Sequence, residues 1–318
     1  MTQEVVNPKL QNVVENIEKV MIGKRKVAEL SVVALLAGGH VLLEDVPGVG
    51  KTMMVRALAK SVGASFKRIQ FTPDLLPSDV IGVSIYNPRE MEFNFRPGPI
   101  MGNIILADEI NRTSPKTQSA LLEGMEEGSV TIDGNTRKLD KPFFVMATQN
   151  PIEYEGTYPL PEAQLDRFLL KMKMGYPEPA EEMEVLHRAQ KNPPIEDLEP
   201  VMTLEELRHL QDEVKEILVD DTIKKYIVDI AGRTRIHANV YLGASPRGSI
   251  ALMKACQAYA FLRGRGYVVP DDVQFLAPFV FAHRIIMKSE ARYEGITPEE
   301  VVERVMARIP VPVQRLVR

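Results

Sequence analysis

The strongest constraint on the fold is a glycine-containing loop that lies between an apolar run and a helical stretch. Residues 41–43 (Val-Leu-Leu) are typical of a short buried strand, and residues 45–52 read Asp-Val-Pro-Gly-Val-Gly-Lys-Thr. The composition of residues 53–64 then favours a helix. A strand, a glycine loop, a Lys-Thr pair and a helix in this order predict a phosphate-binding loop.

The chemistry of such a loop depends on backbone amides and one cation. Gly48 and Gly50 lack side chains, so backbone N–H groups can converge on phosphate oxygens, and the helix N-terminus adds partial positive charge. Lys51 supplies a charge for the β and γ phosphates, and the Thr52 hydroxyl can ligate Mg²⁺. The general pattern begins with glycine, whereas this chain has Asp45. The loop alone therefore leaves an ordinary surface turn open as an alternative.

Composition excludes several other classes of protein. A chain of 318 residues can form two domains, and 45% hydrophobic with 26% charged residues is ordinary for a soluble globular protein. The formal charge of −4 argues against a dedicated nucleic-acid binder. Cys256 is the sole cysteine, which excludes an internal disulfide and favours a reducing cytosol. We find no leader-like N-terminus and no run of 18 apolar residues, so we expect a cytoplasmic protein without membrane insertion.

Short apolar runs alternate with helical patterns from residue 40 to about 173, which predicts an α/β fold with a parallel sheet covered on both faces. Helices are expected to connect these runs. The predicted strands are residues 40–44, 66–71, 103–108, 143–148 and 168–172.

The segment Gly-Tyr-Pro-Glu-Pro at residues 175–179 interrupts this alternation. We therefore predict a nucleotide-binding core over residues 1–175 and a helical domain over residues 176–318. Capping-box patterns predict helix starts in the second domain at Thr203 and Thr297.

Two acids follow the buried apolar run at residues 103–107. Acids at the carboxyl end of a buried strand lie at the mouth of the sheet, where open α/β folds bind ligands. Asp108 can hold Mg²⁺, directly or through water, and Glu109 can polarise a water for attack on a γ-phosphate. A solvated strand end is the alternative, and the glycine loop upstream favours the catalytic interpretation.

Three further polar residues are candidates. Asn150 follows the apolar run 143–148 and can hydrogen-bond the attacking water or the γ-phosphate, although an Asn-Pro turn is a plain alternative. Arg167 is either an ion-pair partner of Asp166 or an arginine finger, which stabilises transition-state charge. Arg247 falls in the first turn of a predicted helix, where the helix dipole disfavours cations. It therefore requires an anion, either a phosphate or a carboxylate.

These motifs together resemble the AAA+ ATPases, and most closely the MoxR family. The resemblance extends from about Met21 to the C-terminus, and this family tolerates an acidic residue at the position of Asp45. Residues 43–52, 70–79, 107–112, 119–123, 147–151, 160–168 and 243–247 carry the resemblance.

The resemblance implies the cofactors ATP and Mg²⁺. Lys51 and Thr52 would form Walker A, with Thr52 and Asp108 holding the metal. Asp108 and Glu109 would form Walker B. The ATP-binding residues would be those of the phosphate loop and of an adenine-contacting segment: Met21, Ile22, Gly23, Pro47, Gly48, Val49, Gly50, Lys51, Thr52 and Met53.

The resemblance also assigns the remaining candidates. Asn150 would be sensor 1, and Arg247 would be sensor 2, reaching the nucleotide of its own subunit. Arg167 would be the finger that reaches the nucleotide of a neighbouring subunit. A homo-oligomeric ring, most often a hexamer, would follow.

Two insertions are expected to form hairpins. Residues 80–100 are similar to the helix-2 insert that magnesium chelatases and MCM helicases share, and residues 128–136 contain an Asp-Gly turn signal. Such hairpins would face the pore or top of a ring, where remodelling targets bind. Ordinary solvent-exposed hairpins are the alternative for both.

The resemblance implies a chaperone-like task, in which a cofactor or metal is inserted into partner proteins, often ones with a von Willebrand factor A domain. Two other functions are left open. One is the motor subunit of a magnesium-type chelatase, and the other is a motor stimulated by nucleic acid, which the acidic net charge disfavours. The five histidines show no metal-ligand spacing.

Overall fold

The structure is a computed structural model that describes residues 6–46, 48–150, 157–189 and 195–312. Its centre is a five-stranded parallel sheet with the strand order β2-β5-β8-β1-β9. The predicted parallel α/β core is thereby confirmed. The strands are β1 (Val41–Glu44), β2 (Phe66–Gln70), β5 (Ile104–Asp108), β8 (Phe144–Gln149) and β9 (Leu170–Met172).

The sheet is buried on both faces because alternate side chains of a strand point in opposite directions. In β5, Ile104 and Leu106 join one hydrophobic core, while Ile105 and Ala107 join the other. Helices α1 (Pro8–Glu18), α2 (Arg25–Leu36) and α3 (Lys51–Ser61) contribute to the first core. The second core includes residues of α4 (Pro77–Ile81) and α5 (Pro115–Glu127). This two-sided burial explains why the central strands are almost continuously apolar.

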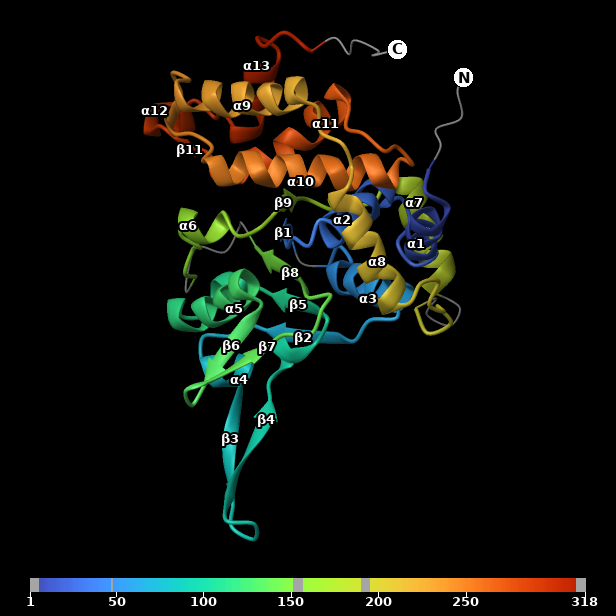
Figure 1. Ribbon diagram of the computed structural model, residues 1–318, viewed down its shortest axis with the longest axis vertical. Coiled ribbons are helices and arrows are strands. Elements are labelled where there is room, and N and C mark those ends of the chain that lie inside the picture. The colour runs from blue at the N-terminus through green and yellow to red at the C-terminus, as the bar shows by residue number, and fades with distance from the viewer. Residues whose placement is uncertain (1–5, 47, 151–156, 190–194, 313–318) are drawn as a thin grey trace.

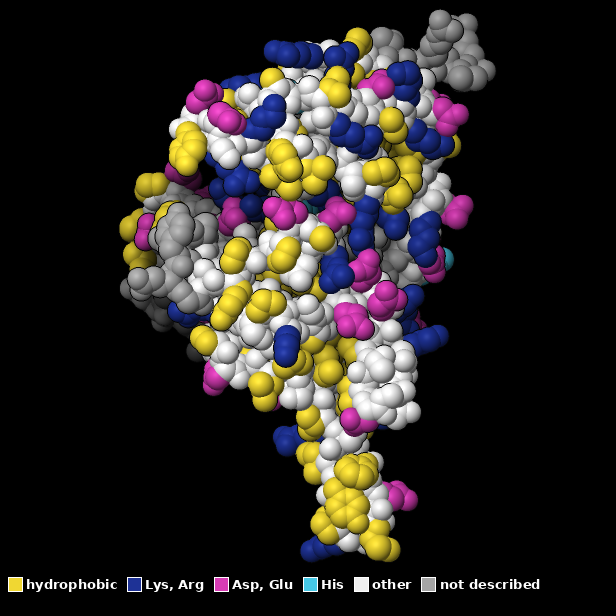
Figure 2. All heavy atoms as spheres, turned by 90° about the vertical axis from the view of Figure 1, so that its left-hand side faces the viewer, with side chains coloured by type: hydrophobic (Ala, Val, Ile, Leu, Met, Phe, Trp, Pro, Cys, Tyr) yellow, Lys and Arg dark blue, Asp and Glu magenta, His cyan; other side chains and the backbone are white. Residues whose placement is uncertain are grey.

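Two antiparallel hairpins form where insertions were predicted. The first pairs β3 (Gly82–Asn87) with β4 (Glu92–Pro97), and it projects far from the sheet (Figure 1). Its outer part carries exposed Tyr86, Met91 and Phe93, seen as a hydrophobic cluster at the bottom of Figure 2. The second pairs β6 (Ser129–Ile132) with β7 (Asn135–Lys138) through a turn at residues 133 and 134 whose φ angles are 50° and 77°.

The region beyond the sheet is helical, and most of it lies at the opposite end from the β3–β4 hairpin (Figure 1). Thr203 and Thr297 cap helices as predicted, each accepting a hydrogen bond from the residue three positions later. The region also contains a short antiparallel pair, β10 (Val240–Leu242) with β11 (Ile286–Met287). Its helices are α7 (Pro179–Ala189), α8 (Leu204–Lys215), α9 (Asp221–Arg235), α10 (Pro246–Leu262), α11 (Pro270–Phe281), α12 (Ser289–Tyr293) and α13 (Pro298–Met306).

The remaining short helices are α6 (Glu162–Leu165), η1 (Pro99–Met101), η2 (Ile110–Arg112) and η3 (Ala282–Arg284). Within the described residues, no helix combines the length and the apolar character that crossing a membrane would require.

A buried arginine joins the helical region to the sheet region. Arg284 in η3 pairs with the carboxylate of Asp166 at 2.6 Å and donates to the carbonyl of Phe168 at 2.7 Å. The neighbouring His283 donates from Nε2 to the same carbonyl at 3.0 Å. Because Arg284 is almost fully buried, these charge-assisted bonds compensate a large desolvation cost. They orient the segment between α6 and β9.

His40 is a buried neutral histidine at the start of β1. Its Nδ1 accepts the Val145 N–H at 3.0 Å, and its Nε2 donates to the Met125 carbonyl at 3.1 Å. Burial lowers the pKa of His40 to about 4, and the hydrogen bond to Met125 opposes this shift only in part. The imidazole therefore connects β8 to α5 as an uncharged group.

This pKa predicts a specific loss of stability in acid. The unfolded chain binds a proton at His40 near pH 6.5, whereas the folded chain resists it until about pH 4. Stability should therefore fall as the pH decreases through this window, by about 3 kcal/mol from this group. Denaturant unfolding from pH 7 to pH 4 measures the effect. His40→Gln should be less stable at pH 7 and show a shallower decline, whereas the exposed control His209→Gln should follow the unaltered chain. Parallel curves for His40→Gln and the unaltered chain would refute this assignment.

Candidate nucleotide-binding site

The phosphate loop connects β1 to α3 with two glycines in the left-handed region. The φ angles of Gly48 and Gly50 are 89° and 91°, a conformation that side chains rarely adopt. A Cβ added at Gly50 would also lie 3.2 Å from the Met21 side chain, so the predicted adenine-contacting segment packs directly on the loop. Val49, which separates the two glycines in the sequence, is buried. Pro47 lies outside the described residues.

The groups around the loop fit a polyphosphate. The first N–H groups of α3, at Lys51, Thr52 and Met53, have no acceptor within the helix and carry the positive end of its dipole. The Lys51 ammonium donates to the Asp45 carbonyl at 3.0 Å, which keeps the cation beside the loop. A Cβ at Gly48 would meet nothing within 4 Å, so the backbone there is open to a ligand.

Asp45 has a structural role that the general loop pattern does not include. Its buried carboxylate accepts the backbone N–H groups of Met174 and Gly175, which follow β9. In the next residue of this segment, the Tyr176 carbonyl accepts a hydrogen bond from the Lys24 ammonium at 2.9 Å. The phosphate loop, the N-terminal segment and the connection to the helical region are therefore held together by direct hydrogen bonds.

The segment predicted to contact adenine lies beside α7. Met21 is buried, Ile22 is half-buried, and Gly23 has a φ angle of 68°. A Cβ at Gly23 would lie 1.9 Å from the Glu181 carboxylate of α7. The left-handed φ angle favours glycine at this position, whereas the Glu181 carboxylate is the end of a flexible side chain and can move aside.

The two predicted acids follow one another at the end of β5. One Asp108 oxygen accepts the Thr148 hydroxyl at 2.7 Å, and the other pairs with Arg68 at 2.6 Å. The Glu109 N–H donates to the same Thr148 oxygen at 2.8 Å. The Thr148 hydroxyl thus fixes Asp108 and Glu109 relative to the neighbouring strand β8.

Glu109 adopts a backbone conformation that is unusual for its type. Its φ and ψ angles of 58° and 48° lie in the left-handed region, which costs energy for a residue with a Cβ. Its carboxylate accepts hydrogen bonds from Gln70 at 2.9 Å and from Arg112 at 3.0 Å. Sequence reasoning missed these partners, although Gln70 ends a strand that neighbours β5 and could have been suspected from that position.

Asn150 is buried directly after β8, which lies between β5 and β1 in the sheet. Its backbone carbonyl lies 3.5 Å from the side-chain amide of Asn111. The preceding Gln149 donates to Glu44 at the end of β1 at 2.7 Å. Parallel pairing therefore brings Asn150, the acids and the phosphate loop to the same edge of the sheet.

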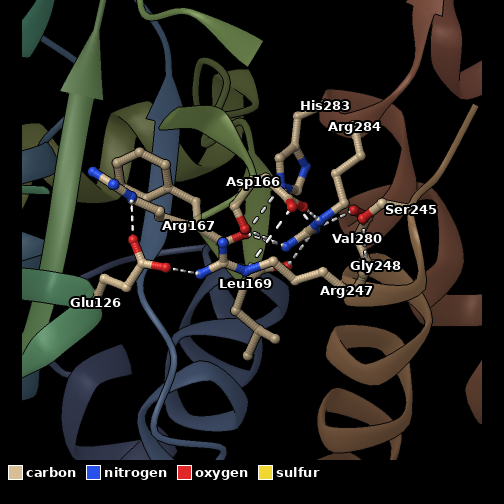
Figure 3. Close-up of polar contacts among 11 residues, drawn as sticks. Glu126, Asp166, Arg167, Leu169, Ser245, Arg247, Gly248, Val280, His283 and Arg284 are labelled. Atoms are coloured by element: carbon tan, nitrogen blue, oxygen red, sulfur yellow. Dashed lines mark hydrogen bonds and ion pairs between the residues drawn. The ribbon is translucent and has the colours of Figure 1, made fainter. Parts of the chain in front are cut away.

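The two predicted arginines share one carboxylate. Glu126 in α5 pairs with Arg167 at 2.8 Å and with Arg247 at 2.8 Å (Figure 3). Asp166 pairs with Arg284 and lies 3.9 Å from Arg247. The anions that face Arg247 in this structure are thus carboxylates, and Glu126 is a partner of Arg167 that the sequence did not reveal.

We expect Gly50→Ala to abolish ATP binding. Alanine is strained at the left-handed φ angle of this position, and its methyl group would lie 3.2 Å from the Met21 side chain. Both effects favour a different conformation of the loop. Titration with a fluorescent ATP analogue measures the loss. Gly232→Ala is the matched control, because a Cβ there meets nothing within 4 Å and its helix should tolerate alanine. Binding by Gly50→Ala as tight as that of the control would contradict the assigned loop geometry.

Asp45→Gly should lower the free energy of unfolding even though it restores the general pattern of the loop. The N–H groups of Met174 and Gly175 would lose their acceptor, at a cost of about 1–3 kcal/mol for a buried unpaired group. Denaturant unfolding gives the stability difference. Asp45→Asn retains one acceptor oxygen and should lose less. Unchanged stability of Asp45→Gly would show that these hydrogen bonds contribute little.

Comparison with known proteins agrees with this architecture. A family model described as an ATPase family associated with various cellular activities (AAA) matches residues 40–170, and an AAA lid domain model matches residues 232–305. The protein YeaC of Bacillus subtilis (strain 168) is 67% identical over 98% of both chains. The chaperone MoxR1 of Mycobacterium tuberculosis is 43% identical over 95% of this chain and 82% of its own.

A solved structure supports the same conclusion. A presumed ATPase of Cytophaga hutchinsonii has a TM-score of 0.91 and 39% identity, over 96% of each chain. Its similarity extends over the sheet region and the helical region alike. The sequence motifs, the fold and these relatives establish that the chain belongs to the MoxR family of AAA+ ATPases.

Proposed function

We propose that this protein hydrolyses ATP with Mg²⁺ and uses the energy to remodel or mature partner proteins. The observation that carries the proposal is the meeting of three elements at one sheet edge. The glycine loop follows β1, the Asp108–Glu109 pair ends β5, and Asn150 follows β8, with the three strands adjacent in the sheet.

Each residue of this edge has a distinct proposed role. Lys51 and the N–H groups at the start of α3 hold the β and γ phosphates. Thr52 and Asp108 hold Mg²⁺, which neutralises phosphate charge as the γ-phosphoryl group leaves. Asp108 is paired with Arg68, so binding a metal requires this ion pair to rearrange.

Glu109 is proposed to accept the proton of the attacking water, and Asn150 to orient that water. The carboxylate of Glu109 is bonded to Gln70 and Arg112 in this structure. Both bonds are made to Oε2, so Oε1 is the oxygen proposed to accept the proton from water.

Arg167 and Arg247 are proposed to complete the site. Arg167 would reach the nucleotide of a neighbouring subunit, and Arg247 would contact a phosphate from the first turn of α10. A lone subunit would then hydrolyse ATP weakly, and a homo-oligomeric ring, most simply a hexamer, would be faster. Residues 1–175 would act as the core and residues 176–318 as a lid whose angle changes on hydrolysis.

The proposed client surface is the projecting β3–β4 hairpin. Tyr86, Met91 and Phe93 are 48%, 77% and 72% exposed, which is unusual for apolar side chains of this size. The chaperone name of the relative MoxR1 supports a remodelling task. We propose a cytoplasmic client, with proteins that carry a von Willebrand factor A domain and receive a metal or cofactor as the first candidates.

Glu109→Gln tests this function directly. The amide cannot accept the proton of water, so ATP turnover should fall at least about a hundredfold while ATP binding persists. Phosphate release and equilibrium binding of an ATP analogue measure the two properties separately. Glu290→Gln, an exposed change in α12, is the control and should retain full turnover. Full activity of Glu109→Gln would remove this residue from the proposed role.

The same variant can identify the client, because it should hold ATP and client together. Capture with Glu109→Gln in ATP, repeated with the Gly50→Ala variant that should not bind ATP, separates nucleotide-dependent partners from background. Stimulation of turnover by DNA would instead favour a nucleic-acid motor, and porphyrin-dependent turnover would favour a chelatase motor.

A further inference from the structure

Glu126 is an acidic residue whose carboxylate contacts both of the functional arginines. One oxygen lies 2.8 Å from Arg167 Nε, and the other lies 2.8 Å from Arg247 Nη2 (Figure 3). The two arginines come from different parts of the chain: Arg167 lies just before β9, whereas Arg247 lies in the first turn of α10. Glu126 thus joins two groups that the sequence separates by 80 residues.

The positions of these charges are unfavourable within their own helices. Glu126 lies in the last turn of α5, where the helix dipole disfavours an anion, and Arg247 lies in the first turn of α10, where it disfavours a cation. Each helix would gain stability from the opposite charge. The ion pair between Glu126 and Arg247 compensates this cost, because the end of α5 and the start of α10 lie close enough for the two charges to meet.

Glu126 is also the carboxylate best able to hold this pair. Asp166, the other acid of the cluster, makes its short contact with Arg284 at 2.6 Å and lies 3.9 Å from Arg247. Three guanidinium groups and two carboxylates leave a net positive charge in the cluster. An additional anion such as a phosphate can therefore bind without removal of Glu126.

Removal of Glu126 would leave two like charges close together. Arg167 and Arg247 are 25% and 49% exposed, so each could swing towards water if its carboxylate partner were lost. Long side chains lose considerable rotamer entropy when they are fixed, and a charge-assisted bond offsets that loss. The carboxylate thus keeps both guanidinium groups in one arrangement before any phosphate arrives.

We propose that Glu126 is a positioning residue: its carboxylate fixes the guanidinium groups of Arg167 and Arg247, so that both are already ordered before either contacts a nucleotide. This inference rests on the proposed ATPase function. Glu126 itself touches no substrate in this scheme and acts only through the two arginines.

The first experiment compares Glu126→Gln with Glu127→Gln, its exposed neighbour in the same helix. Glu126→Gln should lower kcat about ten- to a hundredfold because the arginines lose their orientation, with unchanged affinity for an ATP analogue. Glu127→Gln should match the unaltered chain, and Glu126→Asp should recover part of kcat. If the kcat of Glu126→Gln equals that of Glu127→Gln, the proposal is overturned. A higher kcat would also overturn it, because Glu126 would then inhibit turnover.

The second experiment asks whether Glu126 acts through the two arginines. In a variant that carries both Arg167→Lys and Arg247→Lys, the positioned guanidinium groups are already absent, so adding Glu126→Gln should reduce kcat much less than it does alone. A full, independent reduction in this triple variant would show that Glu126 affects stability or assembly instead, which would overturn the proposal. Sedimentation of each variant with ATP checks assembly directly.

The third experiment does not depend on turnover and separates this inference from the proposed function. In protein labelled with ¹⁵N-arginine, the Nε–H signal of Arg167 should change its chemical shift when the Glu126 charge is removed, because the buried Nε lies 2.8 Å from a Glu126 oxygen. Assignment uses Arg167→Lys and Arg247→Lys. A changed shift in Glu126→Gln, but not in Glu127→Gln, supports the contact even if the unaltered chain has no ATPase activity. The same shift in both variants refutes it.

Discussion

The parallel pairing of β5, β8 and β1 is the constraint on which the candidate site depends. This pairing aligns Ala107 with Ala147 and Leu43 with Thr148, so the three strands end at the same edge. Thr148 then reaches both Asp108 and the backbone of Glu109 from the neighbouring strand. A shift of one residue in this register would turn these polar groups towards the opposite face, which is packed with apolar side chains.

Polar contacts across the boundary between sheet and helices give the molecule a second level of organisation. Asp45 binds the segment after β9, and Arg284 binds the segment before it, so the strand is held at both ends. These contacts connect the phosphate loop to the helical region through residues 166–175. A change at the nucleotide site can therefore reach the helices without passing through the hydrophobic cores, which resist continuous deformation.

Prediction from the sequence succeeded where the signal was local or periodic. The alternation of apolar runs indicated all five strands of the sheet, and an Asp-Gly pair indicated the β6–β7 turn. It failed for long-range partners of charged residues. Asp166 was considered as the partner of Arg167, yet it pairs with Arg284, and Glu126 takes the place beside Arg167. No periodicity links residues 126, 167 and 247, because their proximity depends on how α5 and α10 pack.

The sequence by itself determined the family, the order of strands and helices along the chain, and the residue types of the phosphate loop. These follow from local backbone preferences and from apolar periodicity, which act over a few residues. Tertiary structure alone decided that Asp45 binds the segment after β9, that Gln70 and Arg112 hold Glu109, and that one carboxylate joins two arginines. Such contacts depend on the three-dimensional meeting of distant segments, and a charged side chain does not specify its partner until packing has placed one within reach.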